Sequence, residues 1–182
     1  MDELNLKEDQ EAELHRLLGY YRREAKRCKK AKAYLAGCIM AGAELETALI
    51  LMVNAFPQDL VSISGLPHTK KGVKPLLKWT LAELLRMAKK ANWLPSGLDY
   101  EQDDWDHKKA RVGDRAEVNR ELRNLAHPAQ YLSAHYRKRV TKKHLEFTFT
   151  TINIVNSWLY SRIEDSVLAR MEEEKLAASS SK

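Results

Sequence analysis

Four polar side chains lie close together in one short segment of the chain: Arg120, Arg123, Asn124 and His127. At the roughly 100° per residue of an α-helix, these four side chains share an arc of about 100°. The apolar Val118, Leu122 and Leu125 fall on the opposite side of the same helix. The spacing therefore predicts a helix that buries one face and presents two guanidinium groups, an amide and an imidazole on the other.

These side chains suit the binding and cleavage of a phosphodiester. A guanidinium group binds phosphate oxygens through paired hydrogen bonds, and an imidazole transfers protons near neutral pH. Such chemistry needs no metal ion. RNA supplies its own nucleophile, because its 2′-hydroxyl lies next to the scissile phosphate, whereas DNA lacks that group. The alternative is structural: His127 ends a helix whose dipole favours positive charge there, and the arginines are solvated.

The helix that carries this segment is expected to run from about Asp114 to about residue 127. Asp114 is the expected N-terminal cap, with Glu117 three residues later, as in a capping box. Pro128 disfavours continuation of this helix and can open a short helix of its own. Thr141 is then the expected cap of a long final helix.

One glutamate is expected to position the arginines. The span 33–55 contains only two charged residues, Glu44 and Glu46, and predicts the central helix of a bundle. A buried carboxylate needs a positive partner, and Arg120 or Arg123 is the candidate for Glu46. The alternative is that Glu46 faces solvent at the edge of the bundle.

The remaining segments are predicted to be helices joined by polar connections. Apolar residues spaced by three and four predict an amphipathic helix within 8–32 and another over about 75–93, with a connection over 57–73. Residues 94–112 form a polar loop rich in acids, but they lack the spacing of a calcium-binding loop, so no metal is expected. The run 147–152 alternates like a strand, yet the helical spacing on both sides favours helix.

The composition places the chain among globular all-α proteins. It has 182 residues, 44% hydrophobic and 31% charged, with only 7 glycines and 5 prolines, which disfavours both disorder and a β-sandwich. We expect one bundle of about four to six helices over residues 1–175, with a long C-terminal helix and a frayed tail over 176–182. No apolar run reaches the ~20 residues that cross a bilayer and the N-terminus is acidic, so a cytoplasmic protein with free cysteines is expected.

The net charge of +6 is unevenly distributed. Residues 16–32 carry eight bases and one acid, and residues 107–143 carry eleven bases and three acids. If the fold brings these basic zones together, they form a surface that attracts the phosphate backbone of RNA. The alternative is two ordinary solvated helix faces.

The segment RELRNLAHP at 120–128 follows an apolar helix with the sequence GAELE at 42–46 and precedes a long C-terminal helix. In these features the chain resembles the HEPN superfamily, and in particular bacterial HEPN-like proteins with an Arg-Asn…His-Pro motif. The resemblance extends over roughly residues 10–170. Arg120 has the family's spacing from His127, and Arg123 precedes an asparagine, so both arginines remain candidates.

The resemblance implies a homodimeric, metal-independent endoribonuclease of a toxin–antitoxin or phage-defence system. His127 would transfer the proton, Arg123 or Arg120 would bind the scissile phosphate, and Asn124 and Glu46 would position the substrate and the arginine. An antitoxin or another protein is then a further partner, and neither a cofactor nor a membrane is implied. The alternative is a non-catalytic HEPN-like module for dimerisation, partner docking, or nucleic-acid or nucleotide binding.

Overall fold

Helices dominate the computed structural model, which describes residues 2–98, 108–133 and 139–180. Five helices have ten residues or more: α1 (Glu8–Lys30), α2 (Tyr34–Ala55), α4 (Leu81–Lys90), α5 (Val112–Asn124) and α7 (Lys142–Ser180). Shorter elements join them: the 3-10 turns η1 (Asp2–Leu4) and η2 (Leu76–Lys78), and the helices α3 (Gln58–Val61) and α6 (Pro128–Ser133). Within the described ranges, the strands β1 (His68–Thr69) and β2 (Gly72–Val73) form the only sheet, an antiparallel hairpin. The predicted all-α fold is confirmed.

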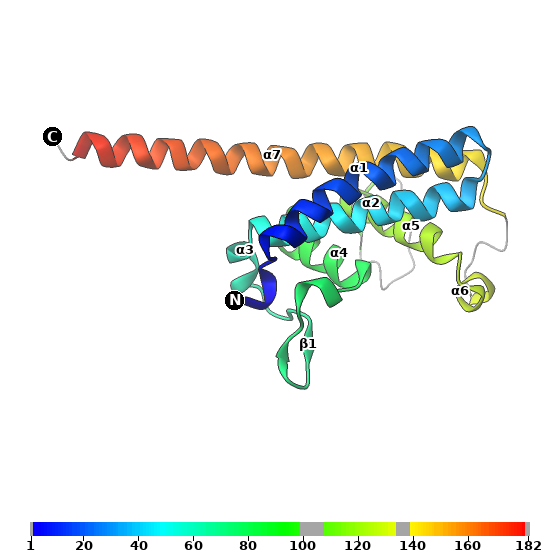
Figure 1. The fold of residues 1–182 in the computed structure, drawn as a ribbon, viewed down its shortest axis with the longest axis horizontal. Coiled ribbons are helices and arrows are strands. Elements are labelled where there is room, and N and C mark those ends of the chain that lie inside the picture. The colour runs from blue at the N-terminus through cyan, green and yellow to red at the C-terminus, as the bar shows by residue number, and fades with distance from the viewer. Residues whose placement is uncertain (1, 99–107, 134–138, 181–182) are drawn as a thin grey trace.

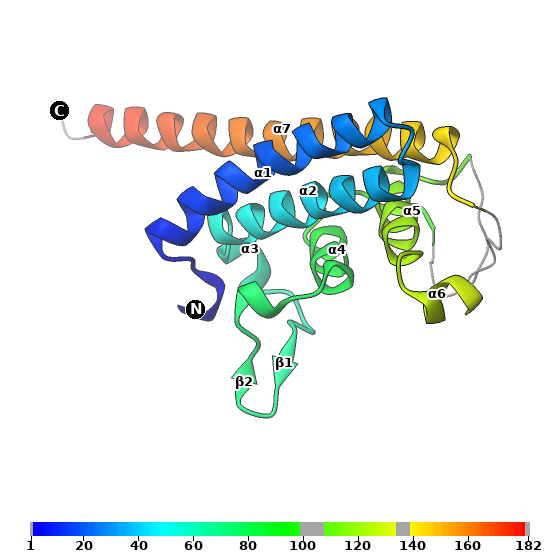
Figure 2. The same cartoon turned by 45° about the vertical axis from the view of Figure 1, so that its right-hand side comes forward.

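Three long helices lie side by side, and two others pack below them (Figures 1 and 2). α2 and α7 run parallel, and α1 runs antiparallel to both. α4 and α5 pack against α2, and α5 also contacts α7. The far end of α7 extends beyond every other element, and the β1–β2 hairpin projects away from α7.

α2 is the central helix of this bundle, as its composition predicts. Leu45 and Leu49 are 0% exposed, and the apolar residues of α2 pack into the core with those of α4, α5 and α7. Among the described helices, α2 alone has the length and apolar composition to span a membrane. Because 56% of its most apolar window is buried inside the protein, the core accounts for that composition.

The helix predicted over 75–93 begins later than expected. Pro75 opens only the 3-10 turn η2, and α4 starts at Leu81. The Thr80 Oγ1 accepts a hydrogen bond from the Glu83 backbone N–H, and the Glu83 carboxylate accepts one from the Thr80 N–H at 2.6 Å. This capping box sets the start of the helix at Thr80 instead of Pro75.

The predicted start of α5 is also wrong, because Asp114 is not its cap. α5 begins at Val112, so Asp114 lies inside the first turn, where it is fully buried. Its Oδ2 accepts hydrogen bonds from the backbone N–H groups of Arg111 at 2.7 Å and Gly97 at 2.8 Å, and its Oδ1 accepts one from the Ser96 hydroxyl. Asp114 therefore ties the preceding loop to the positive end of the helix.

α7 agrees with its predicted start and extends further than its predicted end. It begins directly after Thr141, and the ambiguous run 147–152 is helical. The helix continues to Ser180, into the segment predicted as a tail. Both cysteines are free thiols, and burial raises the pKa of Cys38 to about 11.

Candidate functional site

A hollow of about 470 Å³ opens between α2, the start of α4 and the second half of α5. It is lined by these residues: Glu46, Trp79, Thr80, Leu81, Ala82, Arg120, Arg123 and Asn124. Four of the five residues predicted to form the site therefore line one hollow. The wall from α4 was not predicted, because nothing in the sequence indicates that residues 79–82 approach α5.

Arg123 is the arginine that Glu46 holds. Its Nη2 donates to the Glu46 Oε2 at 2.7 Å, from α5 to α2. The approach depends on Gly42, one turn before Glu46. A Cβ at Gly42 would lie 2.7 Å from the Arg123 Cδ and 3.1 Å from its Cβ, so the arginine stem lies directly against the glycine. The prediction that Glu46 pairs with an arginine is confirmed, and the choice between the two candidates falls on Arg123.

Arg120 has a different partner. Its Nε donates to the Glu117 Oε2 at 2.8 Å, and the Lys89 Nζ of α4 donates to the Glu117 Oε1 at 2.8 Å. The Glu117 side chain is nearly buried. Its carboxylate holds the Nε end of the Arg120 guanidinium group and, through Lys89, joins α4 to α5. The ion pair between Glu117 and Arg120 could have been predicted from the sequence, because residues three apart meet on one helix face. Lys89 lies too far away in sequence to be inferred.

His127 lies beyond the end of α5 and does not line the hollow. Its backbone N–H donates to the Asn124 carbonyl at 2.9 Å, and its carbonyl accepts from the Tyr131 N–H at 2.9 Å. The residue thus connects α5 to α6, with an exposed side chain. The predicted common arc assumed a continuous helix to residue 127, but α5 ends at Asn124, so its helical phase does not extend to the imidazole.

The hollow is electrostatically suited to an anion. Two arginines and Lys89 face two carboxylates, Glu46 and Glu117, which leaves an excess of positive charge. Burial raises the pKa of Glu46, and the charge of Arg123 offsets part of that effect. Each guanidinium group has five N–H donors, so the carboxylate contacts leave others for a ligand. The arrangement can bind a phosphate between two oriented arginines.

The two basic zones come together where α1 ends and α7 begins. Lys29, near the end of α1, lies 3.7 Å from the Glu146 carboxylate, and Lys142 lies 3.6 Å from the same group. The last turn of α1 and the first turn of α7 therefore form one basic end of the bundle (Figure 1). The acidic cluster 99–106 lies outside the described residues, and within the described ones no group of His, Cys, Asp and Glu side chains could hold a metal ion.

Comparisons with protein-family models, with curated proteins and with solved structures find no match for this chain. The expected membership of the HEPN superfamily therefore stays a prediction from the segments 42–46 and 120–128. Function is argued below from the site itself.

Proposed function

We propose that this chain is a cytoplasmic, metal-independent endoribonuclease of the HEPN type, acting as a homodimer in a toxin–antitoxin or phage-defence system. One observation carries the proposal: Arg120, Arg123 and Asn124 line a single hollow, and a glutamate orients each arginine. Oriented guanidinium groups are the form in which arginine best binds a phosphate that gains charge during a reaction.

In the proposed reaction, the scissile phosphate of RNA occupies the hollow, where Arg123 and Arg120 bind its non-bridging oxygens. The 2′-oxygen of the ribose attacks phosphorus, and His127 takes the proton of that hydroxyl. The bond from phosphorus to the 5′-oxygen breaks, and this oxygen receives a proton from water or from His127 of a second copy. The products carry a 2′,3′-cyclic phosphate and a 5′-hydroxyl.

The position of His127 is compatible with this role. Its side chain is exposed and follows Asn124 of the hollow by three residues. In the proposal it reaches a bound strand from the solvent side. A second copy facing the same strand would supply a second imidazole as the proton donor for the leaving oxygen, and this is the role that the proposal gives to the homodimer.

The test is cleavage of a long single-stranded RNA by the purified chain in excess EDTA. We expect cleavage by the wild type, with His127→Ala slowing it by about 10²- to 10⁴-fold, the usual contribution of a general acid or base. His15→Ala is the matched control, because His15 is an exposed histidine on α1, away from the hollow. Equal cleavage rates for the wild type and His127→Ala would contradict the proposed mechanism.

A second candidate function is a non-catalytic module that binds RNA or a protein partner, an antitoxin included. It is favoured by the carboxylate partners of both arginines and by the absence of His127 from the lining of the hollow. This function predicts RNA binding that weakens with rising salt and no products at any protein concentration.

A further inference from the structure

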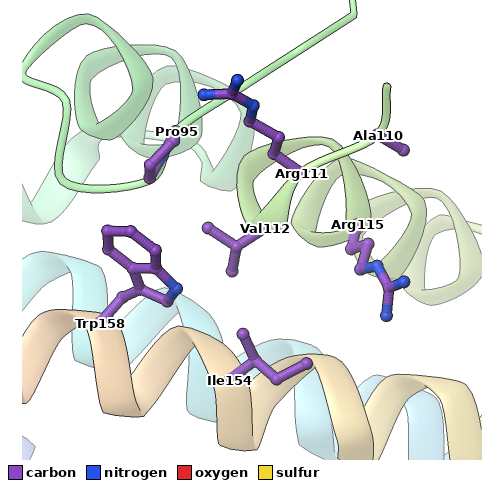
Figure 3. A pocket seen from close by; sticks show the side chains of 7 residues that line it. All are labelled: Pro95, Ala110, Arg111, Val112, Arg115, Ile154 and Trp158. Atoms are coloured by element: carbon purple, nitrogen blue, oxygen red, sulfur yellow. The ribbon is translucent and has the colours of Figure 1, made fainter. Parts of the chain in front are cut away.

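A second hollow, of about 490 Å³, lies on another side of α5, between its first turn, α7, and described residues on either end of the loop before α5. Its lining is mainly apolar: Pro95 and Ala110 from the loop, Val112 from α5, and Ile154 and Trp158 from α7. Arg111 and Arg115 complete it (Figure 3). This volume falls within the ~300–1,000 Å³ of small-molecule sites.

Trp158 differs from the two buried tryptophans of the described chain. Trp79 and Trp93 are 4% and 2% exposed, and their indole N–H groups donate to the Lys74 carbonyl and the Asp59 carboxylate. Trp158 is 47% exposed, and its indole group makes no hydrogen bond to the described residues. In Figure 3 its ring extends from α7 toward Val112 and Pro95. An open indole face of this kind stacks well on planar rings.

Arg111 and Arg115 also differ from the arginines of the first hollow. Arg120 and Arg123 each donate to a carboxylate, whereas neither Arg111 nor Arg115 forms an ion pair with the described part of the chain. Both residues lie at the N-terminal end of α5, one turn apart, where the helix dipole disfavours positive charge. Two guanidinium groups at a positive helix end, without a carboxylate partner among the described residues, are stabilised by binding an anion.

We propose that this second hollow binds an anion that carries a planar ring, with a nucleoside phosphate as the ligand class. The ring stacks on Trp158 over the apolar surface of Val112 and Ile154. The phosphate pairs with Arg115 and, once its exposed side chain turns, with Arg111, whose guanidinium group points away from Arg115 in Figure 3. The ligand is either a free nucleotide or one nucleotide of a single strand. The inference does not depend on the proposed ribonuclease activity, because the two hollows share no lining residue.

The test is titration calorimetry on the full chain carrying Arg123→Ala, which disables the first hollow. AMP, adenosine and inorganic phosphate are the probes for a free nucleotide, and a short single-stranded RNA is the probe for a strand. We expect AMP to bind at least tenfold more tightly than adenosine or phosphate, because only AMP joins ring and anion. Trp158→Ala and the double variant Arg111→Ser, Arg115→Ser should each weaken binding roughly tenfold or more.

Matched controls exist for both changes. Tyr160→Ala removes another exposed aromatic ring of α7, and Arg86→Ser removes an exposed arginine of α4, and neither residue lines the hollow. Both control variants should bind as the parent chain does. Binding of the RNA alone, lost in the Trp158 and arginine variants, supports the site with a strand as its ligand. Binding of neither AMP nor RNA, or binding that these variants leave unchanged, overturns the inference.

Discussion

The contact between Arg123 and Glu46 depends on a residue that has no side chain. Gly42 lies beneath the Arg123 stem, so the guanidinium group can cross α2 and reach Glu46 at 2.7 Å. Glycine in a helix interior costs ~1 kcal/mol relative to alanine, so its presence here needs a compensating gain. The oriented arginine is that gain.

Gly42→Ala should therefore damage the site instead of stabilising α2. In the wild type we expect RNA cleavage to fall at least tenfold, because the new Cβ would lie 2.7 Å from the Arg123 Cδ and would displace the stem. In an Arg123→Ala background the contact with Cδ is gone and only the 3.1 Å contact with the Cβ of residue 123 remains, so the same change should cost much less stability, with a coupling energy of about 1 kcal/mol or more. Urea unfolding of the wild type, the two single variants and the double variant measures this coupling energy. Additive effects would show that glycine and arginine act independently.

At the scale of elements, α1, α2 and α7 meet around a buried carboxylate. Glu44 of α2 is 1% exposed, its Oε1 accepts from the Asn156 Nδ2 of α7 at 3.3 Å, and the Arg22 Nε of α1 lies 3.9 Å away. Burial raises the pKa of Glu44, and Arg22, Asn156 and Lys26 offset part of the effect. The Glu44 carboxyl group therefore keeps its proton in the folded protein at pH values at which the same group has lost it in the unfolded chain.

This shift makes stability depend on pH in a defined direction. The free energy of unfolding should fall as pH rises from 4.5, the ordinary pKa of glutamate, through the raised pKa of Glu44. Glu44→Gln removes this contribution, so the variant should gain stability relative to the wild type as the pH rises toward 7. Urea midpoints from pH 4.5 to 7 measure the difference, with the exposed Glu13→Gln as control. Parallel pH profiles for wild type and Glu44→Gln would contradict this account.

Hydrophobic spacing was sufficient to predict α1 and α7, because their apolar residues recur every three to four positions on the side that faces the bundle. The near absence of charge predicted α2, which is buried on most of its sides. Hydrophobic spacing did not predict where α4 begins or where α5 ends, because local hydrogen bonds set these positions. Thr80 and Glu83 delay the start of α4, and α5 ends before His127, which removes the imidazole from the predicted common face. The β1–β2 hairpin has only two residue pairs, too short for any periodicity, and β2 begins at Gly72, whose φ is positive.

On the scale of the whole molecule, α7 consists of a packed part and an overhang. Leu145, Ile152, Val155 and Leu159 are buried in the bundle. Arg162 then donates to the Asp59 carboxylate at 2.9 Å and lies 5.2 Å from the centre of the Phe56 ring. Farther along, Leu168 and Met171 are exposed, and Figures 1 and 2 show this part of the helix clear of the other elements.

Deletion of residues 164–182 should therefore leave the bundle intact. We expect the free energy of unfolding to change by less than about 1 kcal/mol, as for surface changes without buried contacts. Deletion from Leu159 onward is the matched control, since it removes a buried leucine and the Arg162 contacts, and it should cost several times more. A large loss of stability from the shorter deletion would show that the overhang packs against the rest of the chain.

The central claim is that the hollow beneath Arg120 and Arg123 directs attack by a ribose hydroxyl on the neighbouring phosphate. Mass spectrometry of the products from a short RNA in EDTA tests it most directly, with a matched RNA carrying 2′-deoxyribose at the cleaved position. We predict a 2′,3′-cyclic phosphate from the first RNA and no cut at the deoxy position of the second. An uncut RNA, a product with a free 3′-hydroxyl, or a cut at the deoxy position would contradict the account.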